Sequence, residues 1–229
     1  MNILVAPDSF KDSLSASEVS RIISEAISAV IPSASIRKIP ISDGGEGLLK
    51  ALLTPLQGTL VSVSVKDPLH RTIEASYGLV DQGKTAIIEM ATASGLELLS
   101  IEERNPLITS TYGTGELIKN ALDKGCTKII IGLGGSATND GGIGMIKALG
   151  GLFLDQYNQE IPDGGGALST LHSIDLSGLD KRLQQVAIVC ACDVDNPLTG
   201  PSGASYVYAK QKGASDNMLA VLDSNLSNY

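Results

Sequence analysis

Tryptophan is absent from this 229-residue sequence and aromatic residues make up only 3% of it, so the core must be built from aliphatic side chains. No segment reaches the roughly 18 apolar residues that a membrane-spanning helix requires, and the start, MNILVAPDSF, lacks the basic and long apolar regions of a secretory signal. Basic residues are also few: 17 Lys and Arg against 25 Asp and Glu give a net charge of −8. This balance argues against nucleic-acid and membrane partners, which require basic patches.

Cysteine and histidine are scarce as well. The three cysteines are Cys126, Cys190 and Cys192, and the Cys-Ala-Cys spacing fits neither a metal site nor a redox motif. We therefore expect buried, reduced thiols and a cytoplasmic location. The two histidines, His70 and His172, lie in a turn and a polar loop with no evident partner, so we expect surface side chains rather than general acids or bases.

The first part of the chain has the pattern of a parallel β-α-β unit. Two continuous apolar runs, residues 2–8 and 35–42, are typical of buried strands. Between them, Ser15 and Glu18 have the spacing of a capping box at a helix start, and Pro32 ends the helix. A loop with the sequence DGGEG and a short helix follow.

The pattern changes near residue 61. Alternating segments at 61–65 and 73–79, with TAIIEMA after them, predict an antiparallel meander. A helix from about Thr114 follows, and Gly125 suits the position just after its end. Next come a strand ending at Leu133, a glycine-rich loop, another helix and a buried strand over 186–194. GLFLDQYNQEI is typical of a hairpin.

This order predicts an α/β protein whose first part is a parallel-sheet unit and whose later part contains a mixed sheet. Two parallel strands and two helices are too few for independent stability. The final helix, with Met218, Leu222 and Leu226 on one face, has no later element to cover it. We therefore expect the fold to be completed by a second fragment or a second copy, or the chain to be a cut version of a longer protein.

Four carboxylates occupy one kind of position. Asp8, Asp43 and Asp193 end apolar runs, and Asp140 lies in the loop after KIIIGL. Ligands of open α/β sheets bind outside the carboxyl ends of the strands. A single such Asp is commonly a turn former or helix cap, but four of them favour a binding site.

Two glycine-rich loops, DGGEG and GGSATNDGG, fit phosphate binding, because glycine lets the backbone approach a ligand and a helix start offers free N–H groups. Two ligands fit the second loop. Gly132, Gly134 and Ala137 with Asp155 match a nicotinamide dinucleotide fingerprint. Against it, the loop runs on past Ala137 and carries a carboxylate, which favours a nucleoside triphosphate with Mg²⁺. A kinase also needs a cation, for which Lys11, Lys210 and Lys212 are candidates.

Six motifs resemble, in order, those of the type-1 glycerate kinases: APDSFKDSLSA, DGGEG, GTGELI, GGSATNDGGIGM, CDVDNPLTG and QKGAS. The resemblance covers essentially the whole chain. It implies phosphorylation of D-glycerate with ATP and Mg²⁺, usually to 2-phosphoglycerate in bacterial members, in a cleft between two α/β domains. On this resemblance, residues 1–64 would be the N-terminal part of a Rossmann-like parallel-sheet domain, and residues 65–229 a second, inserted mixed-sheet domain. Leu48 stands where the family usually has Thr, and Ala209-Lys210 where it has Gly-Pro. Family chains also continue well past the equivalent of Tyr229.

We therefore expect a glycerate kinase with Asp193 as the base that takes the hydroxyl proton. Asp140 is the alternative base, Lys11 holds an anion, and Asp140 and Asp43 are candidate Mg²⁺ ligands. The residues expected to bind ATP are Gly134, Gly135, Ser136, Asn139, Gly141, Asp8 and Ser9, and those expected to bind glycerate are Asp43, Gly44, Gly45, Glu46 and Lys212. Two alternatives stay open, a nicotinamide-dependent oxidoreductase and a non-catalytic nucleotide-binding or regulatory fragment.

Overall fold

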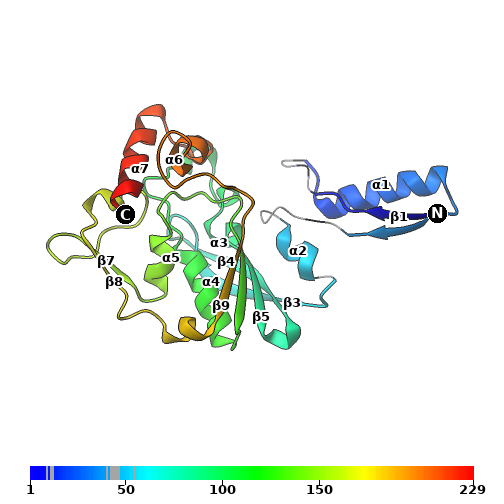
Figure 1. The fold of residues 1–229 in the computed structure, drawn as a ribbon, viewed down its shortest axis with the longest axis horizontal. Coiled ribbons are helices and arrows are strands. Elements are labelled where there is room, and N and C mark those ends of the chain that lie inside the picture. Colours follow the sequence, from blue (N-terminus) through cyan, green and yellow to red (C-terminus); the bar gives the residue numbers. More distant parts are fainter. Residues whose placement is uncertain (9, 11–12, 40, 42–46, 54) are drawn as a thin grey trace.

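The computed structural model describes residues 1–229 except 9, 11–12, 40, 42–46 and 54. The chain forms an α/β protein in which a small amino-terminal unit lies apart from a larger body (Figure 1). The small unit is a two-stranded parallel sheet with one helix, made from β1 (Asn2–Val5), α1 (Ala16–Val30) and β2 (Ser35–Lys38). The carboxyl end of β1 points toward the larger body.

The predicted start of α1 is confirmed. Ser15 is the N-cap, its side chain accepts from the Glu18 N–H, and the Glu18 carboxylate returns to the Ser15 N–H at 3.0 Å. The expected burial of this unit is wrong, because a two-stranded sheet has one helix and leaves its other surfaces open. Leu4 is 60% exposed and Val30 81%, while Val5 and Val19 are buried.

A mixed five-stranded sheet organises the larger body in the order β3-β4-β5-β6-β9. The predicted meander is confirmed, because β3, β4 and β5 pair antiparallel, whereas β5, β6 and β9 run parallel. The strands are β3 (Thr59–Lys66), β4 (Thr72–Val80), β5 (Thr85–Glu89), β6 (Lys128–Gly132) and β9 (Ala187–Ala191).

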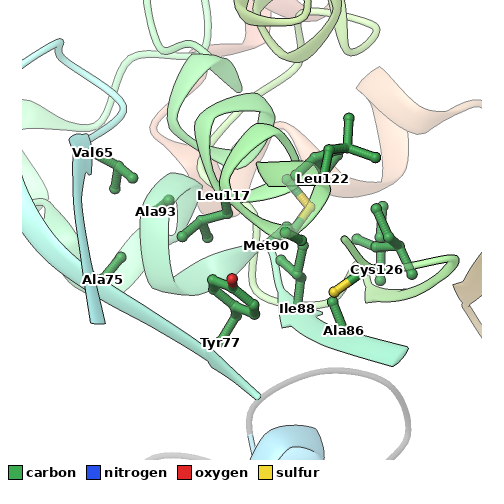
Figure 2. Packing of buried hydrophobic residues seen from close by; sticks show 14 of the residues in the cluster. Val65, Ala75, Tyr77, Ala86, Ile88, Met90, Ala93, Leu117, Leu122 and Cys126 are labelled. Carbon is green, nitrogen blue, oxygen red and sulfur yellow. The ribbon is translucent and has the colours of Figure 1, made fainter. Parts of the chain in front are cut away.

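One face of this sheet carries the main core, which is aliphatic as the composition requires. Strand residues such as Ile88 and Ile131 pack against the apolar side of α4 (Tyr112–Asp123), where Leu117 and Ile118 are almost fully buried (Figure 2). Helix α4 ends as predicted, with Gly125 in the left-handed region at φ +81°.

The GTGELI motif explains how α4 approaches the sheet so closely. A side chain at Gly113 would place its Cβ 1.8 Å from the Lys66 carbonyl oxygen. Glu116, one turn later, accepts a hydrogen bond from the Lys66 N–H at 2.6 Å. The motif therefore anchors the helix to the end of β3.

Helix α2 (Leu48–Leu53) covers part of the other face, packing beside Val80 and Ile87. Strand β3 begins at Thr59 and belongs wholly to the larger sheet, so the strand crosses the expected boundary between residues 64 and 65. The division into two domains stays a prediction.

The remaining elements pack at the far side of the body, around a second cluster that includes Ile143, Phe153 and Leu168. They are α5 (Ile143–Ala148), β7 (Leu152–Leu154), β8 (Ser173–Asp175), α6 (Ala204–Tyr208) and α7 (Asp216–Asn228), with several single turns of 3-10 helix. The short helix α3 (Ala91–Ser94) instead packs in the main core through Ala93. Strand β7 pairs with β8, and the expected hairpin is limited to a single bridge between Leu154 and Glu160.

Two further expectations about burial are wrong. The apolar side of α7 is covered by this chain itself, because Leu226 joins the second cluster and Leu222 packs with Ala209 and Ala214. Strand β9, expected to be buried, is the last strand of the sheet and is open, with Ile188 46% and Val189 45% exposed. None of the helices in the described parts of the chain combines the length and apolar character needed to cross a membrane.

Candidate functional site

Three parallel strands end at one edge of the large sheet and bring polar residues together there. Glu89 ends β5, the glycine loop (residues 133–142) follows Gly132 of β6, and Asp193 follows β9 by two residues. The register pairs Glu89 with Gly132 and Gly132 with Ala191, so the three exits are adjacent. This is the edge at which α/β sheets bind ligands.

The glycine loop is fastened to the segment that follows β5. The Leu96 N–H donates to the Gly135 carbonyl at 2.9 Å, and the Ala137 N–H donates to the Ser94 carbonyl at 2.9 Å. Gly135 has φ +75°, a conformation that glycine adopts without strain. The two bonds hold the backbone around Ser136 in one path across the sheet edge.

Lys212 reaches this loop from the other end of the sequence. Its Nζ donates to Ser136 Oγ at 2.8 Å and to the Thr138 carbonyl at 2.6 Å, and the side chain is buried. Burial lowers the pKa of Lys212 to about 8, and the negative charge of Asp140 acts in the opposite direction. Both direct partners are neutral oxygens, so most of the ammonium charge remains to attract an anion.

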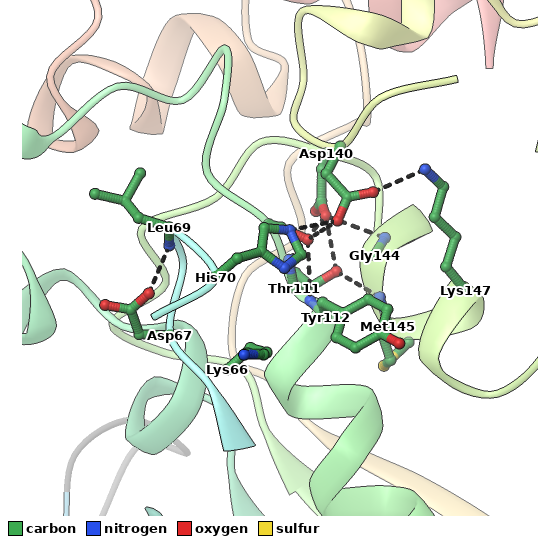
Figure 3. Close-up of polar contacts among 12 residues, drawn as sticks. Lys66, Asp67, Leu69, His70, Thr111, Tyr112, Asp140, Gly144, Met145 and Lys147 are labelled. Atoms are coloured by element: carbon green, nitrogen blue, oxygen red, sulfur yellow. Dashed lines mark hydrogen bonds and ion pairs between the residues drawn. The ribbon is translucent and has the colours of Figure 1, made fainter. Parts of the chain in front are cut away.

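Asp140 is almost completely buried beneath the loop, at 1% exposure. Its Oδ2 accepts from the Thr111 N–H at 2.9 Å, from Thr111 Oγ1 at 2.8 Å and from the Gly144 N–H at 3.3 Å, and its Oδ1 accepts from the Gly142 N–H at 3.1 Å (Figure 3). Burial raises the pKa of Asp140 and the four hydrogen bonds oppose that shift. The carboxylate therefore joins the starts of α4 and α5 to the end of the loop.

Asn139 and Gly141 are also held by the protein interior. The Asn139 amide donates to Ser205 Oγ at 3.1 Å, and both side chains are buried. Gly141 has φ +62°, and a Cβ there would lie 2.8 Å from the Tyr229 ring. Gly134, Gly135 and Ser136 are the more open part of the loop.

The predicted residues of the amino-terminal unit are largely outside the described residues: Ser9, Lys11, Asp43, Gly44, Gly45 and Glu46. Asp8 is described, just beyond β1 and partly buried. The structure thus brings Asp193, Ser136, Asp140 and Lys212 to one region. Asp193 is exposed on the segment that leaves β9.

Other expectations can be compared directly with the structure. Asp155 takes part in its own turn, where Oδ1 accepts from the Tyr157 and Gln159 N–H groups at 2.8 and 2.9 Å. Lys210 pairs with Asp216 at 2.7 Å on the surface. All three cysteines are free, but only Cys126 is buried, because Cys190 and Cys192 lie on or beside the open strand β9.

His70, expected to lack a partner, has one. Its Nε2 lies 2.8 Å from Asp163 Oδ2, which also accepts from Ser110 Oγ at 2.8 Å, while Lys147 Nζ binds Asp163 Oδ1 at 2.7 Å. Burial acts to raise the pKa of Asp163, but the bonds from Lys147 and Ser110 outweigh it and lower the pKa. Ser110 and His70 both contact the carboxylate rather than each other, so the trio does not have the geometry of a hydrolytic triad.

Two polar positions at this edge of the sheet were missed in the sequence. Glu89 ends the apolar run TAIIE in the same way that Asp193 ends the run VAIVCAC, so the sequence carried the same pattern of a carboxylate at a strand end. In the structure, Glu89 Oε1 accepts a hydrogen bond from the Leu49 N–H of α2 at 2.6 Å. Thr111 carried no signal, because its role depends on contacts with Asp140 and with the Met145 N–H, which donates to Thr111 Oγ1 at 2.9 Å.

The chain is similar to known proteins along its whole length. A family profile described as "Glycerate kinase family" matches residues 3–229. The chain is 55% identical to a glycerate kinase from Bacillus subtilis (strain 168) and 52% identical to a glycerate 2-kinase from Escherichia coli (strain K12), in each case over all of this chain and 60% of the relative. A crystal structure from Salmonella typhimurium LT2, assigned there as a glycerate kinase 2, matches with a TM-score of 0.88 and 51% identity, over 100% of this chain and 61% of that one. The chain thus spans about 60% of the length of these relatives.

The buried ammonium of Lys212 gives a pH-dependent stability prediction. Its pKa is about 8 in the folded chain and about 10.4 when unfolded, so between these values the unfolded state binds more protons and stability rises with pH. Relative to Lys212→Met, the parent should therefore gain up to about 3 kcal/mol in free energy of unfolding from pH 8 to pH 10.4. Urea denaturation of both proteins across this range measures it, and a constant difference would contradict the shift.

Proposed function

The chain belongs to the glycerate kinase family, and we propose that it carries the catalytic edge of an enzyme that phosphorylates D-glycerate with MgATP to give 2-phosphoglycerate. The observation that carries the proposal is the meeting of a fastened glycine loop, a buried lysine and an exposed carboxylate at the ends of β6 and β9. A phosphoryl transfer needs this set: backbone and cationic groups for phosphate, and a carboxylate for the hydroxyl proton.

In this proposal the open part of the loop, Gly134 to Ser136, binds phosphate with its backbone, and Lys212 supplies positive charge beneath it. Asp193 accepts the proton of the glycerate hydroxyl. The hydroxyl oxygen forms a bond to the γ-phosphorus, the bond from that phosphorus to the β–γ bridging oxygen breaks, and ADP leaves. Asp193 is better placed than Asp140 for this role, because it is exposed whereas Asp140 is buried with four donors on its carboxylate.

Mg²⁺ enters the proposal as part of the MgATP substrate. Asp140 does not fit a metal, because N–H and O–H donors face its oxygens where a cation would have to sit. Asp43, the other predicted ligand, lies outside the described residues. Among the residues that the structure describes, no group of three or more His, Cys, Asp or Glu could hold a metal ion. We therefore assign no step to a protein-bound metal.

The small amino-terminal unit is proposed to be part of a Rossmann-like domain that further polypeptide, or a second copy, completes in a cytoplasmic enzyme. Exposed apolar side chains such as Leu4 and Val30 support this reading. Determining the mass of the 229-residue chain in solution tests one branch, because a strictly monomeric chain would rule out a second copy.

A coupled assay tests the function. D-glycerate, MgATP and the 229-residue chain are mixed and ADP release is followed, and we expect ADP to form only when glycerate is present. ATP binding without turnover would support the non-catalytic reading. NADH binding without turnover would support the oxidoreductase.

The role of Asp193 gives a second prediction. Asp193→Asn should lower kcat by about 10²–10⁴-fold, the usual contribution of a general base. Asp195→Asn is a matched control, because Asp195 is an exposed carboxylate on the same segment, and it should retain most activity. Near-normal turnover by Asp193→Asn would exclude it as the base.

The role of Asp140 is separated from metal binding by leaving the metal out. In Asp140→Asn, the side-chain NH₂ faces N–H donors at the start of α4 or α5 and cannot accept their hydrogen bonds. The loop is then held less firmly, and ATP affinity should fall about tenfold. Calorimetry should show the same loss with Mg²⁺ and with EDTA. A loss confined to the Mg²⁺ titration would instead identify Asp140 as a metal ligand.

The Thr111 variants test the same contact from its other side. Thr111→Ser keeps the hydroxyl and should bind ATP like the parent, whereas Thr111→Val should weaken ATP binding.

A further inference from the structure

The side chain of Arg104 makes no hydrogen bond or ion pair among the residues that the structure describes. Arg104 follows the single turn Ile101–Glu103, is half-buried, and its Nε is buried with no hydrogen-bond partner, one of two such side-chain atoms in the described part of the chain. Arg71 shows the usual alternative, since it binds Asp67, Glu103 and the Leu98 carbonyl. Buried donors are normally paired, so an unpaired one in a charged group is open to a hydrogen bond from the protein to a ligand.

The neighbouring carboxylate does not serve Arg104. Glu103 accepts from Arg71 at 2.6 Å through Oε1 and from the Ser100 N–H at 3.0 Å through Oε2. Its pKa is lowered, first by the Ser100 bond and then by Arg71. No ion pair of Arg104 is found within the described ranges. Because a guanidinium stays protonated in proteins, the positive charge persists.

Arg104 lies beside the residue that anchors the glycine loop. Its backbone packs on Gly213, where a Cβ would be 2.1 Å from the Arg104 carbonyl oxygen and 2.8 Å from the Arg104 Cβ. Gly213 directly follows Lys212, whose ammonium binds Ser136 and the Thr138 carbonyl. The backbone of Arg104 therefore packs directly beside the segment that carries Lys212, whose ammonium binds the glycine loop.

We propose that Arg104 is an anion-binding residue of this site, which takes an oxyanion of the substrates beside Lys212. The inference rests on the proposed function. A planar guanidinium group can bind a carboxylate or a phosphate through two parallel, charge-assisted hydrogen bonds. Within the proposed reaction, the oxyanion is either the carboxylate of glycerate or a phosphate of ATP.

The test measures binding and stability of the 229-residue chain together. Affinities for D-glycerate and for MgATP are measured separately by calorimetry for the parent, Arg104→Met and Arg104→Lys. Arg104→Met should bind one ligand about ten- to a hundredfold more weakly, the range for a lost charge-assisted pair. Loss for glycerate identifies its carboxylate as the oxyanion, and loss for MgATP identifies a phosphate. Arg104→Lys keeps the charge without the planar guanidinium and should fall between.

Stability separates binding from a structural role. Since the Arg104 side chain has no hydrogen bond or ion pair within the described ranges, Arg104→Met should not lower the Tm, whereas a structural arginine would. The control is Arg182→Met, a surface residue paired with Asp180 and Asp123, which should bind both ligands like the parent. Parent-like binding of both ligands by Arg104→Met would overturn this inference alone. A parent chain that binds neither ligand would overturn the proposed function and the inference with it.

Discussion

The carboxylate of Asp140 lies where two helices begin and the glycine loop ends, and it accepts four hydrogen bonds there. A charge so deeply buried is tolerated only when its oxygens are satisfied. Since the donors belong to Thr111, Gly142 and Gly144, the position of α4 relative to α5 and the path of the loop are fixed together. Lys212 then holds the same loop from its other side, so the open segment around Ser136 has little freedom to move.

Much of this edge could be predicted from the sequence, because parallel strands bring their ends together and continuous apolar runs identify those strands. The capping box at Ser15 and the left-handed Gly125 follow from local rules and are confirmed. Local rules could not place Lys212 against Ser136, 76 residues away, or His70 against Asp163, 93 residues away. Such contacts are set by how whole elements pack, and no periodicity in the sequence encodes them.

Whether a strand or helix is buried could be predicted less well from the sequence than whether it forms. An apolar run indicates that a strand could be buried, but the neighbours decide whether it is. Strand β1 has one neighbour and β9 is the last of its sheet, so both are open, although their sequences are as apolar as that of β6. The opposite error occurred at α7, where Leu222 and Leu226 find partners within the chain. Sequence alone specifies the element, whereas topology specifies its surroundings.

The open edge of β9 has a consequence for the behaviour of the chain in solution. Its sequence, AIVCA, contains no charge and no proline, the two devices that usually stop one sheet from adding to another. The net charge of −8 supplies repulsion between molecules in its place. Salt shortens the range of that repulsion to about 10 Å at 0.1 M. Colloidal stability of this chain therefore depends on ionic strength, and dilute buffer keeps its molecules apart better than concentrated salt.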